Sequence, residues 1–495
     1  MNAFPQRVQA ARRGAGAAAI LFMSLGVLGG CSDILDVELP AQLGDEVLES
    51  PVGAQSQINS IIGQFENAHN EFLIETWGRE AFGETPTSHS QSRTSAYYTR
   101  VYAAASFSGN YFAPMMKARR FAFGLHEKLQ NEWTVAEVPQ RAQFLAISSI
   151  YGGAVLSWMG SSLCESVIDG PLLTSAQTLA LADTWLTQAL AEIASAGDFA
   201  MPYGASTSAK TMTHGLRAQV RWMAGDTDGA RQDAELVPAG FFAYVTRDTD
   251  TGRRNLAWEM TTFSINMKLY DVITWWDGPV NPATGLAWAN PIPFTGWVNL
   301  AILPDGRAVR EDGLPIRTKG PHTTADEQAN ATRDTRVKHF RGKFRTGGDS
   351  VDVVDRYAGP DDDIPLVNWK EMVLIRAEIG GGQTAIDLVN ELRTADGLPL
   401  VTYADPSNAE QIRYMIFEER RRALFAEGRF TYTKFQNPDI MWFPRNDGHL
   451  RDLGAAGYEG GVRWLMPYEE YELADGLTLA DRATGCPEHQ RPVQY

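Results

Sequence analysis

Tryptophans gather in one Pro- and Gly-rich stretch of the sequence together with polar side chains. The group consists of Trp275, Trp276, Asp277, Asn281, Trp288, Asn290 and Trp297. A sugar has an apolar face of C–H groups and a fringe of hydroxyls, so it binds to an exposed aromatic ring flanked by carboxylate, amide or guanidinium groups. We therefore predict that this stretch binds a ligand. The alternative is that the indoles hold loops onto a frame, because tryptophan is highly buried on average.

A smaller group of the same chemistry lies nearer the start of the sequence. Trp77, Arg79 and Glu84 combine an indole with a guanidinium and a carboxylate, and we expect them in a polar, aromatic loop that also contains Tyr97. The candidate ligand-binding residues are thus Trp77, Arg79, Glu84, Trp275, Trp276, Asp277, Trp288 and Trp297.

Common catalytic motifs are absent from the sequence. It has no His-Glu-x-x-His, no Cys-x-x-Cys, no Gly-rich phosphate loop and no Gly-x-Ser-x-Gly elbow, and its histidines are scattered. We predict no catalytic residue and no enzymatic activity. A glycosidase needs only two carboxylates about 5 to 10 Å apart, so a surface glycoside hydrolase stays an alternative.

No cofactor and no transition metal are predicted. One acidic group, Asp352, Asp355, Asp361, Asp362 and Asp363, offers the hard oxygen ligands that calcium prefers. Because it lacks the spacing of a known calcium loop, we favour a solvated acidic loop over a structural calcium site.

The net charge of -16 argues against nucleic acid as a partner, since binding a phosphate backbone needs clustered cations. The densest basic run, Arg420 to Arg422, directly follows Glu418 and Glu419. Glu419 shares a helix face with Ile412, Met415 and Ile416, so we expect a buried carboxylate that needs a cationic partner. Arg376 or Arg420 could supply that partner, which predicts a structural ion-pair network of Arg376, Glu419 and Arg420.

The first residues are typical of an exported lipoprotein. Arg7, Arg12 and Arg13 precede a short apolar stretch, Ala17 to Leu28, which ends in Leu28-Gly29-Gly30-Cys31. Small residues before a cysteine match a bacterial lipobox, so we predict a signal peptide over residues 1–30 and lipidation of Cys31. Residues 31–51 form an acidic tether. Ser32 follows the cysteine where an aspartate would signal retention in the inner membrane, so it is compatible with the outer membrane.

The remaining cysteines, Cys164 and Cys486, are expected to form a disulfide. Export would place this even pair in an oxidising compartment, where a disulfide is more common than two free thiols.

Three pairs of helices are indicated by apolar residues at helical spacing. In the first pair, one helix runs from Phe144 and the other begins after Thr174. The helices of the second pair are separated at Gly225-Asp226, and those of the third at Gly380 to Gly382. Such pairs, with small residues where partners approach, resemble tetratricopeptide units. The predicted fold is therefore mainly α, with tetratricopeptide-like helical pairs in a single globular scaffold over residues 52–495.

A loop-rich insertion, about residues 241–365, is predicted to split these repeats, because it is rich in Gly, Pro, Asn and Trp and has no sustained periodicity. Two further helices are expected before the repeats, one with Ile58, Ile61, Ile62 and Phe65, and another from Met115 to Leu129. Long loops on a rigid frame commonly carry the function.

Three stretches of the chain carry a family resemblance: the lipobox with the following Ser32 to Pro40, the Glu-Arg and Glu-Gly-Arg segment Phe417 to Arg429, and Trp464 to Leu473 with its Pro-x-x-Glu motif. Together they resemble the SusD/RagB family of outer-membrane nutrient-binding lipoproteins. The ending, Leu477 to Tyr495, departs from the family pattern. This indicates a divergent subgroup.

The resemblance implies a SusD-like fold and a binding protein that is not an enzyme. Such a protein captures oligosaccharide or polysaccharide and delivers it to a SusC-like TonB-dependent transporter, while its lipid holds it on the outer membrane. Some members of the family do not handle sugar, so a binder of peptide or another nutrient is a further alternative.

Overall fold

The computed structural model describes the chain over residues 48–82, 112–163, 165–263, 350–398 and 404–429, and over short pieces at 300–302, 308–310, 336, 338–343, 400–401 and 433. The chain divides into two units, Met1–Ser50 and Pro51–Tyr495. The elements below belong to the second unit. The predicted signal peptide and tether fall almost entirely outside the described residues.

The first helical pair consists of α5 (Arg141–Ser162) and α6 (Ser175–Ala196), which are joined by a short hairpin of β1 (Glu165–Val167) and β2 (Leu172–Thr174). Thr174 begins α6 with a capping box: its side chain accepts from the Gln177 amide, and the Gln177 side chain accepts from the Thr174 amide. This pair was expected from the sequence.

Helix α5 is buried on nearly all sides, as expected for a helix that is apolar all round. Gly153 and Gly160 let α6 approach closely, because a Cβ at either position would lie within 3 Å of Leu186 or Leu179. Among the described helices, α5 alone is long and apolar enough to cross a membrane, and its burial identifies it as a core helix here.

Two further pairs confirm the predicted repeats. Helices α7 (Ala209–Ala224) and α8 (Thr227–Glu235) are separated by Gly225, whose left-handed φ of 83° ends α7. Helices α11 (Trp369–Gly380) and α12 (Gly382–Ala395) meet at Gly381, which has a φ of 60°. The mainly α, tetratricopeptide-like fold class is thus confirmed.

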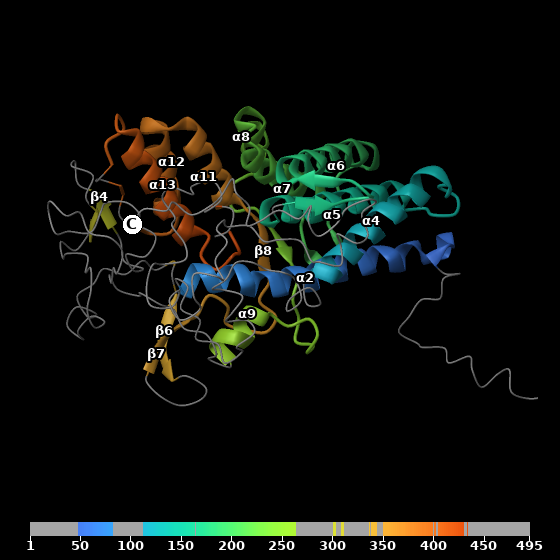
Figure 1. The fold of residues 1–495 in the computed structure, drawn as a ribbon, viewed down its shortest axis with the longest axis horizontal. Coiled ribbons are helices and arrows are strands. Elements are labelled where there is room, and N and C mark those ends of the chain that lie inside the picture. The colour runs from blue at the N-terminus through green and yellow to red at the C-terminus, as the bar shows by residue number, and fades with distance from the viewer. Residues whose placement is uncertain are drawn as a thin grey trace, which may run out of the picture. The chain divides into compact units, whose positions relative to one another are not determined.

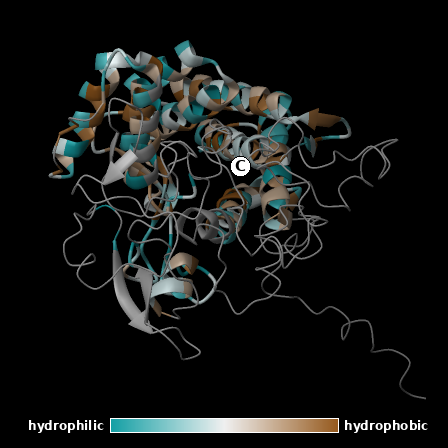
Figure 2. Ribbon diagram, turned by 60° about the vertical axis from the view of Figure 1, so that its left-hand side comes forward, coloured by the Kyte–Doolittle hydropathy of each residue, from teal (hydrophilic) through white to brown (hydrophobic). Residues whose placement is uncertain are grey.

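The helices stack in chain order around one continuous core, as Figure 1 shows. Helix α2 (Ala54–Phe82) packs on α4 (Ala113–Asn131), α4 on α5, and α6 on α7. Helix α11 packs on α8, and α13 (Ala409–Ala423) packs on both α11 and α12. Figure 2 shows hydrophobic and hydrophilic residues mixed along these helices, as expected for helices that bury one face.

The insertion leaves and rejoins the frame at one place. Strand β3 (Phe242–Val245) pairs antiparallel with β8 (Ile364–Asn368), so that Phe242 lies opposite Asn368 and Val245 lies opposite Ile364. Because α11 packs directly on α8, the stack continues across the insertion. Helix α7 lies close to β8 at Gly215, where a Cβ would clash with Val367.

Within the insertion, the described elements are short, as expected. They are α9 (Leu256–Trp258), the π-helical η5 (Glu259–Phe263), and the antiparallel pairs of β4 (Leu300–Ile302) with β5 (Ala308–Arg310) and β6 (His339–Lys343) with β7 (Ser350–Val354). Two 3-10 turns lie outside it, η1 (Pro51–Gly53) and η4 (Pro202–Gly204).

One expectation at the N-terminal side was wrong. Trp77 and Arg79 were expected in a loop, but α2 extends to Phe82 and includes both residues. From Glu71 to Phe82 the sequence contains one glycine and no proline, so nothing in it stops the helix.

Candidate functional site

Most of the predicted ligand-binding residues lie outside the described part of the chain. This applies to Glu84, Trp275, Trp276, Asp277, Trp288 and Trp297, and also to Cys31, Cys164 and Cys486. Trp77 and Arg79 are placed on α2 by their backbone. The structure describes the parts of the sequence that adjoin both predicted regions. They are the middle of α2 and the segment of the insertion that leads into residue 264.

Helix α2 and the start of the insertion are joined through Asn70. Its Nδ2 donates to the carbonyl of Arg254 (3.0 Å), and its Oδ1 accepts from the amide of Leu256 (3.0 Å). Asn255 caps α9 by accepting from the Trp258 amide, and its Nδ2 donates to the carbonyl of Asp362 (2.8 Å). The helix with Trp77 and Arg79 and the chain that leads into the predicted tryptophan stretch are therefore anchored to one another.

An exposed aromatic pair follows directly. The rings of Trp258 and Phe263 stack with centroids 5.0 Å apart and an interplanar angle of 26°. Phe263 is 64% exposed, while Trp258 is half-buried. The π-helical turn explains the pairing, because its i→i+5 hydrogen bonding brings residues five apart onto one side.

A bidentate ion pair stands in the same turn. Arg254 Nε lies 2.6 Å from Glu259 Oε2, and Arg254 Nη2 donates to Glu259 Oε1 (3.1 Å). Both side chains are about a quarter exposed, at 28% and 26%. We call Trp258, Phe263, Arg254 and Glu259 the aromatic platform. It combines an open ring face with a hydrogen-bond donor and an acceptor, which is the chemistry expected of a sugar site.

Sequence reasoning missed the aromatic platform. It followed the density of tryptophans, and Trp258 stands apart from that group. The five-residue spacing of Trp258 and Phe263 gives no signal under α-helical or strand periodicity. Only the π-helical turn makes the two rings neighbours.

A buried network fixes the segment beneath the platform to α2. Glu66 accepts from the amide and hydroxyl of Thr246 (2.9 and 2.7 Å) and pairs with Arg253 (3.2 Å) and Arg247 (3.6 Å). Burial lowers the pKa of Arg247 to about 10 although Glu66 opposes the shift. Burial, with Arg429 and Arg247 nearby, lowers the pKa of His69 to about 3, so His69 is neutral at pH 7. Glu66 and Arg247 are buried and Arg253 is 31% exposed, so the network ties the segment to α2 and suits a support for the platform.

The Glu-Arg segment, residues 417–429, holds a second buried network. Glu419 is buried as expected, but its cationic partners are Arg393 (2.6 Å) and Arg336 (2.6 Å) rather than Arg376 or Arg420. Arg420 pairs instead with Glu378 (3.1 Å) and approaches Glu371 (3.8 Å). A buried ion-pair network is therefore present, but its pairs differ from the predicted ones. The partners of Glu419 come from elements that are distant in sequence.

The same segment joins the insertion to the frame. Glu427 accepts from Arg356 (2.9 Å) of the insertion and from Asn368 at its end. Arg429 donates to Glu371 (2.9 Å) of α11, which also accepts from Gln219 (2.7 Å) of α7. These carboxylates are held by guanidinium or amide groups, so they serve as structural acceptors.

Two of the acidic residues near 360 accept from backbone amides. Asp362 accepts from the amide of Gly359 (3.1 Å), and Asp363 accepts from the amide of Arg247 (2.7 Å). Within the described residues no cluster of histidine, cysteine or carboxylate side chains is arranged to hold a metal ion.

Solved structures similar to this one are SusD-like proteins. A SusD superfamily protein from Bacteroides thetaiotaomicron matches at 13% identity over 84% of this chain and 95% of its own, with a TM-score of 0.51. A SusD homologue from the same species matches at 9% identity over 89% and 99%, also with a TM-score of 0.51. Surface glycan-binding protein A from that species, solved with laminarihexaose, matches at 12% identity over 86% and 98%, with a TM-score of 0.48.

No protein-family model and no curated protein sequence matches the chain. At identities of 9% and 13%, the structural similarity shows the fold alone. The resemblance drawn from the lipobox, the Glu-Arg segment and the Pro-x-x-Glu segment is confirmed at that level: this chain has the SusD-like fold.

Proposed function

We propose that the protein binds a glycan at the outer membrane and passes it to a SusC-like TonB-dependent transporter. The observation that carries this proposal is the aromatic platform, an exposed Trp258–Phe263 stack beside the Arg254–Glu259 ion pair. It lies on a SusD-like fold and precedes the predicted tryptophan stretch in the sequence. The sequence resemblance to the SusD/RagB family supports the same function.

Binding without catalysis is favoured by the state of the carboxylates. Hydrolysis of a glycosidic bond needs one carboxyl group as general acid and a second as nucleophile or base. The buried carboxylates Glu66, Glu371, Glu419 and Glu427 each accept from arginine, amide or hydroxyl groups. Such pairing gives these four carboxylates a structural role.

Attachment through Cys31 belongs to the proposal because it determines how tightly the glycan must be held. A lipid anchor keeps the binder and a transporter in one membrane, which raises their effective concentration. A modest affinity at each site is then sufficient. This also favours release into the transporter.

The test is calorimetric titration of the purified full chain with a panel of oligosaccharides that includes laminarihexaose. We expect binding without release of shorter products. In the double variant Trp258→Ala/Phe263→Ala, affinity for the bound glycan should fall at least about tenfold, which corresponds to about 1.4 kcal/mol. Loss of the stacking surface is the physical reason.

Phe121→Ala is the matched control, because Phe121 is an exposed phenylalanine on α4, outside the aromatic platform. It should leave affinity unchanged. Catalytic shortening of any oligosaccharide would favour the glycoside hydrolase instead. Binding of peptides with no response to the sugar panel would favour the third alternative.

A further inference from the structure

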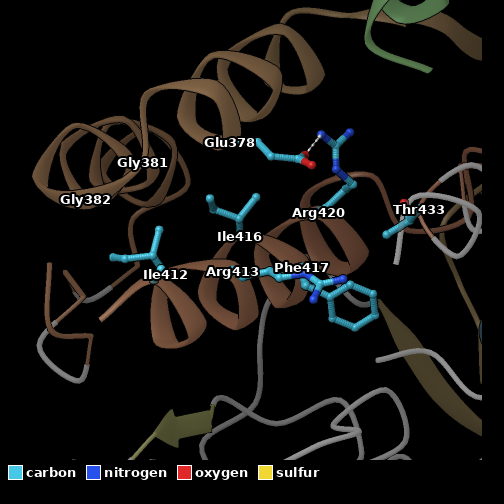
Figure 3. Close-up of a pocket in the computed structure, with 10 residues that line it drawn as sticks. Glu378, Gly381, Gly382, Ile412, Arg413, Ile416, Phe417, Arg420 and Thr433 are labelled. Atoms are coloured by element: carbon cyan, nitrogen blue, oxygen red, sulfur yellow. Dashed lines mark hydrogen bonds and ion pairs between the residues drawn. The ribbon is translucent and has the colours of Figure 1, made fainter. Parts of the chain in front are cut away.

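A cavity lies on the helical frame, between α13 and the turn that joins α11 to α12. Its volume is about 460 Å³, within the roughly 300–1,000 Å³ of small-molecule sites. Its lining is formed by Glu378, Gly381, Gly382, Ala409, Ile412, Arg413, Ile416, Phe417, Arg420 and Thr433 (Figure 3). None of these residues belongs to the aromatic platform.

Two adjacent rows of α13 side chains form one wall. Ile412 and Ile416 are four residues apart and project toward the α11–α12 turn, as Figure 3 shows. Arg413 and Phe417 form the neighbouring row. The wall is therefore closely packed, since Ile412 and Ile416 are 4% exposed and Phe417 is 2% exposed, and the side chain of Arg413 beside it is exposed.

The opposite side offers a fixed carboxylate. Glu378 is 36% exposed and lies 3.1 Å from Arg420, which is itself almost fully buried. Arg420 lies over the ring of Trp222 at 4.1 Å and approaches Glu371 at 3.8 Å. Because Arg420 is held from several sides, the Glu378 carboxylate is held in place while part of it remains open as an acceptor.

The turn itself keeps the cavity open. Gly381 and Gly382 have φ values of 60° and 49°, which L side chains rarely adopt. A Cβ at Gly381 would meet nothing within 4 Å. The two glycines thus close a tight helix–helix connection without filling the space beside it.

We propose that this cavity binds a short, neutral saccharide and is a second sugar site on the frame. The apolar wall matches the C–H face of a sugar ring, while Glu378 accepts from hydroxyls and Arg413 donates to them. A polyhydroxylated ligand can donate to a carboxylate and accept from a guanidinium at once, whereas an anion or a cation would suit only one of them. This inference rests on the proposed glycan-binding function.

The experiment uses the full chain and three neutral disaccharides as probes: laminaribiose, cellobiose and maltose. In the Trp258→Ala/Phe263→Ala background, calorimetry should still detect binding of at least one disaccharide. Adding Glu378→Gln/Arg413→Ala should weaken that binding at least tenfold. Glutamine at 378 can still accept from Arg420, so the fold should be retained.

Glu391→Gln/Arg120→Ala is the matched control, since both residues are exposed and lie on α12 and α4. It should leave disaccharide binding unchanged. The cavity proposal is overturned if the platform variant binds none of the three probes, or if its binding survives Glu378→Gln/Arg413→Ala. Failure of the wild-type chain to bind any sugar would overturn the proposed function as well, so the two failures differ.

Discussion

Asp233 shows how single buried carboxylates hold this frame together. It lies on α8 with 1% exposure and accepts from His214 Nδ1 (2.8 Å), from Arg217 Nε and Nη2 (2.8 and 2.7 Å), and from Arg221 Nη1 (3.0 Å) of α7. Burial alone would raise its pKa, but the hydrogen bonds from His214 and Arg217 and the two guanidinium charges outweigh it and lower the pKa. One carboxylate thereby fastens two helices.

Replacing Asp233 by asparagine should lower the free energy of unfolding by about 3 kcal/mol at pH 7, because buried arginines lose their counter-charge. Since the folded-state pKa is depressed, this stabilisation is present above the unfolded value near 3.9 and disappears as the pH falls through the folded value. Urea unfolding at pH 7 and at pH 2–3 should show the difference between wild type and Asp233→Asn shrinking in acid.

Asp228→Asn on the same helix is the control for that measurement. Asp228 is 83% exposed and pairs with Arg231 only at 3.3 Å, so its replacement should cost less than about 1 kcal/mol. A pH-independent loss in Asp233→Asn would contradict the assigned role of its charge.

At the scale of elements, helix starts depend on local chemistry that the sequence displays. Thr174→Ala should reduce the free energy of unfolding by about 1 kcal/mol, because it removes the acceptor that satisfies the Gln177 amide at the start of α6. Thermal and urea unfolding would measure this. Thr184→Ala, at an exposed interior position of α6, should instead be neutral or slightly stabilising through higher helix propensity.

The difference between local signals and contacts over long sequence distances explains which elements could be predicted. Caps and glycine breaks are local, so the pairs α5–α6, α7–α8 and α11–α12 follow from the sequence. Helix α2 was underestimated because the polar and aromatic composition near Trp77 was given more weight than the absence of a helix stop. The π-helical turn of the aromatic platform and the partners of Glu419 depend on contacts between distant segments, which no single window of sequence contains.

At the scale of the whole second unit, the insertion interrupts the helical pairs in sequence but is held to them by a strand pair and by ion pairs. Its ends meet in the β3–β8 pair, while Arg336 and Arg356 reach back to Glu419 and Glu427 of the Glu-Arg segment. That segment also binds α11 through Arg420 and Arg429. The charged Glu-Arg segment, which the sequence could only suggest as a network, therefore joins the loop-rich insertion to the helical frame.

Two anchor points hold the ends of the middle part of the insertion close together. The hydroxyl of Thr262 donates to the carbonyl of Tyr357 (3.2 Å), and the carbonyl of Lys338 accepts from the amide of Asp355 (2.9 Å). Residues 262 and 338 are thus both held beside residues 355–357. A short Gly/Ser linker in place of residues 264–335 has little distance to span, and shortening a loop carries little entropic cost.

This excision should leave helical circular dichroism and cooperative unfolding in place, since Arg336 and both strands of the β6–β7 hairpin are retained. It removes Trp275, Trp276, Trp288 and Trp297 but keeps the aromatic platform. If both regions contact the glycan, affinity should fall at least about tenfold yet remain measurable by calorimetry. Adding Trp258→Ala/Phe263→Ala should then reduce binding of long glycans to what the cavity lined by Glu378 and Arg413 can supply. An excised chain that binds as well as wild type would remove the tryptophan stretch from the site, and one that unfolds without cooperativity would show that the frame depends on it.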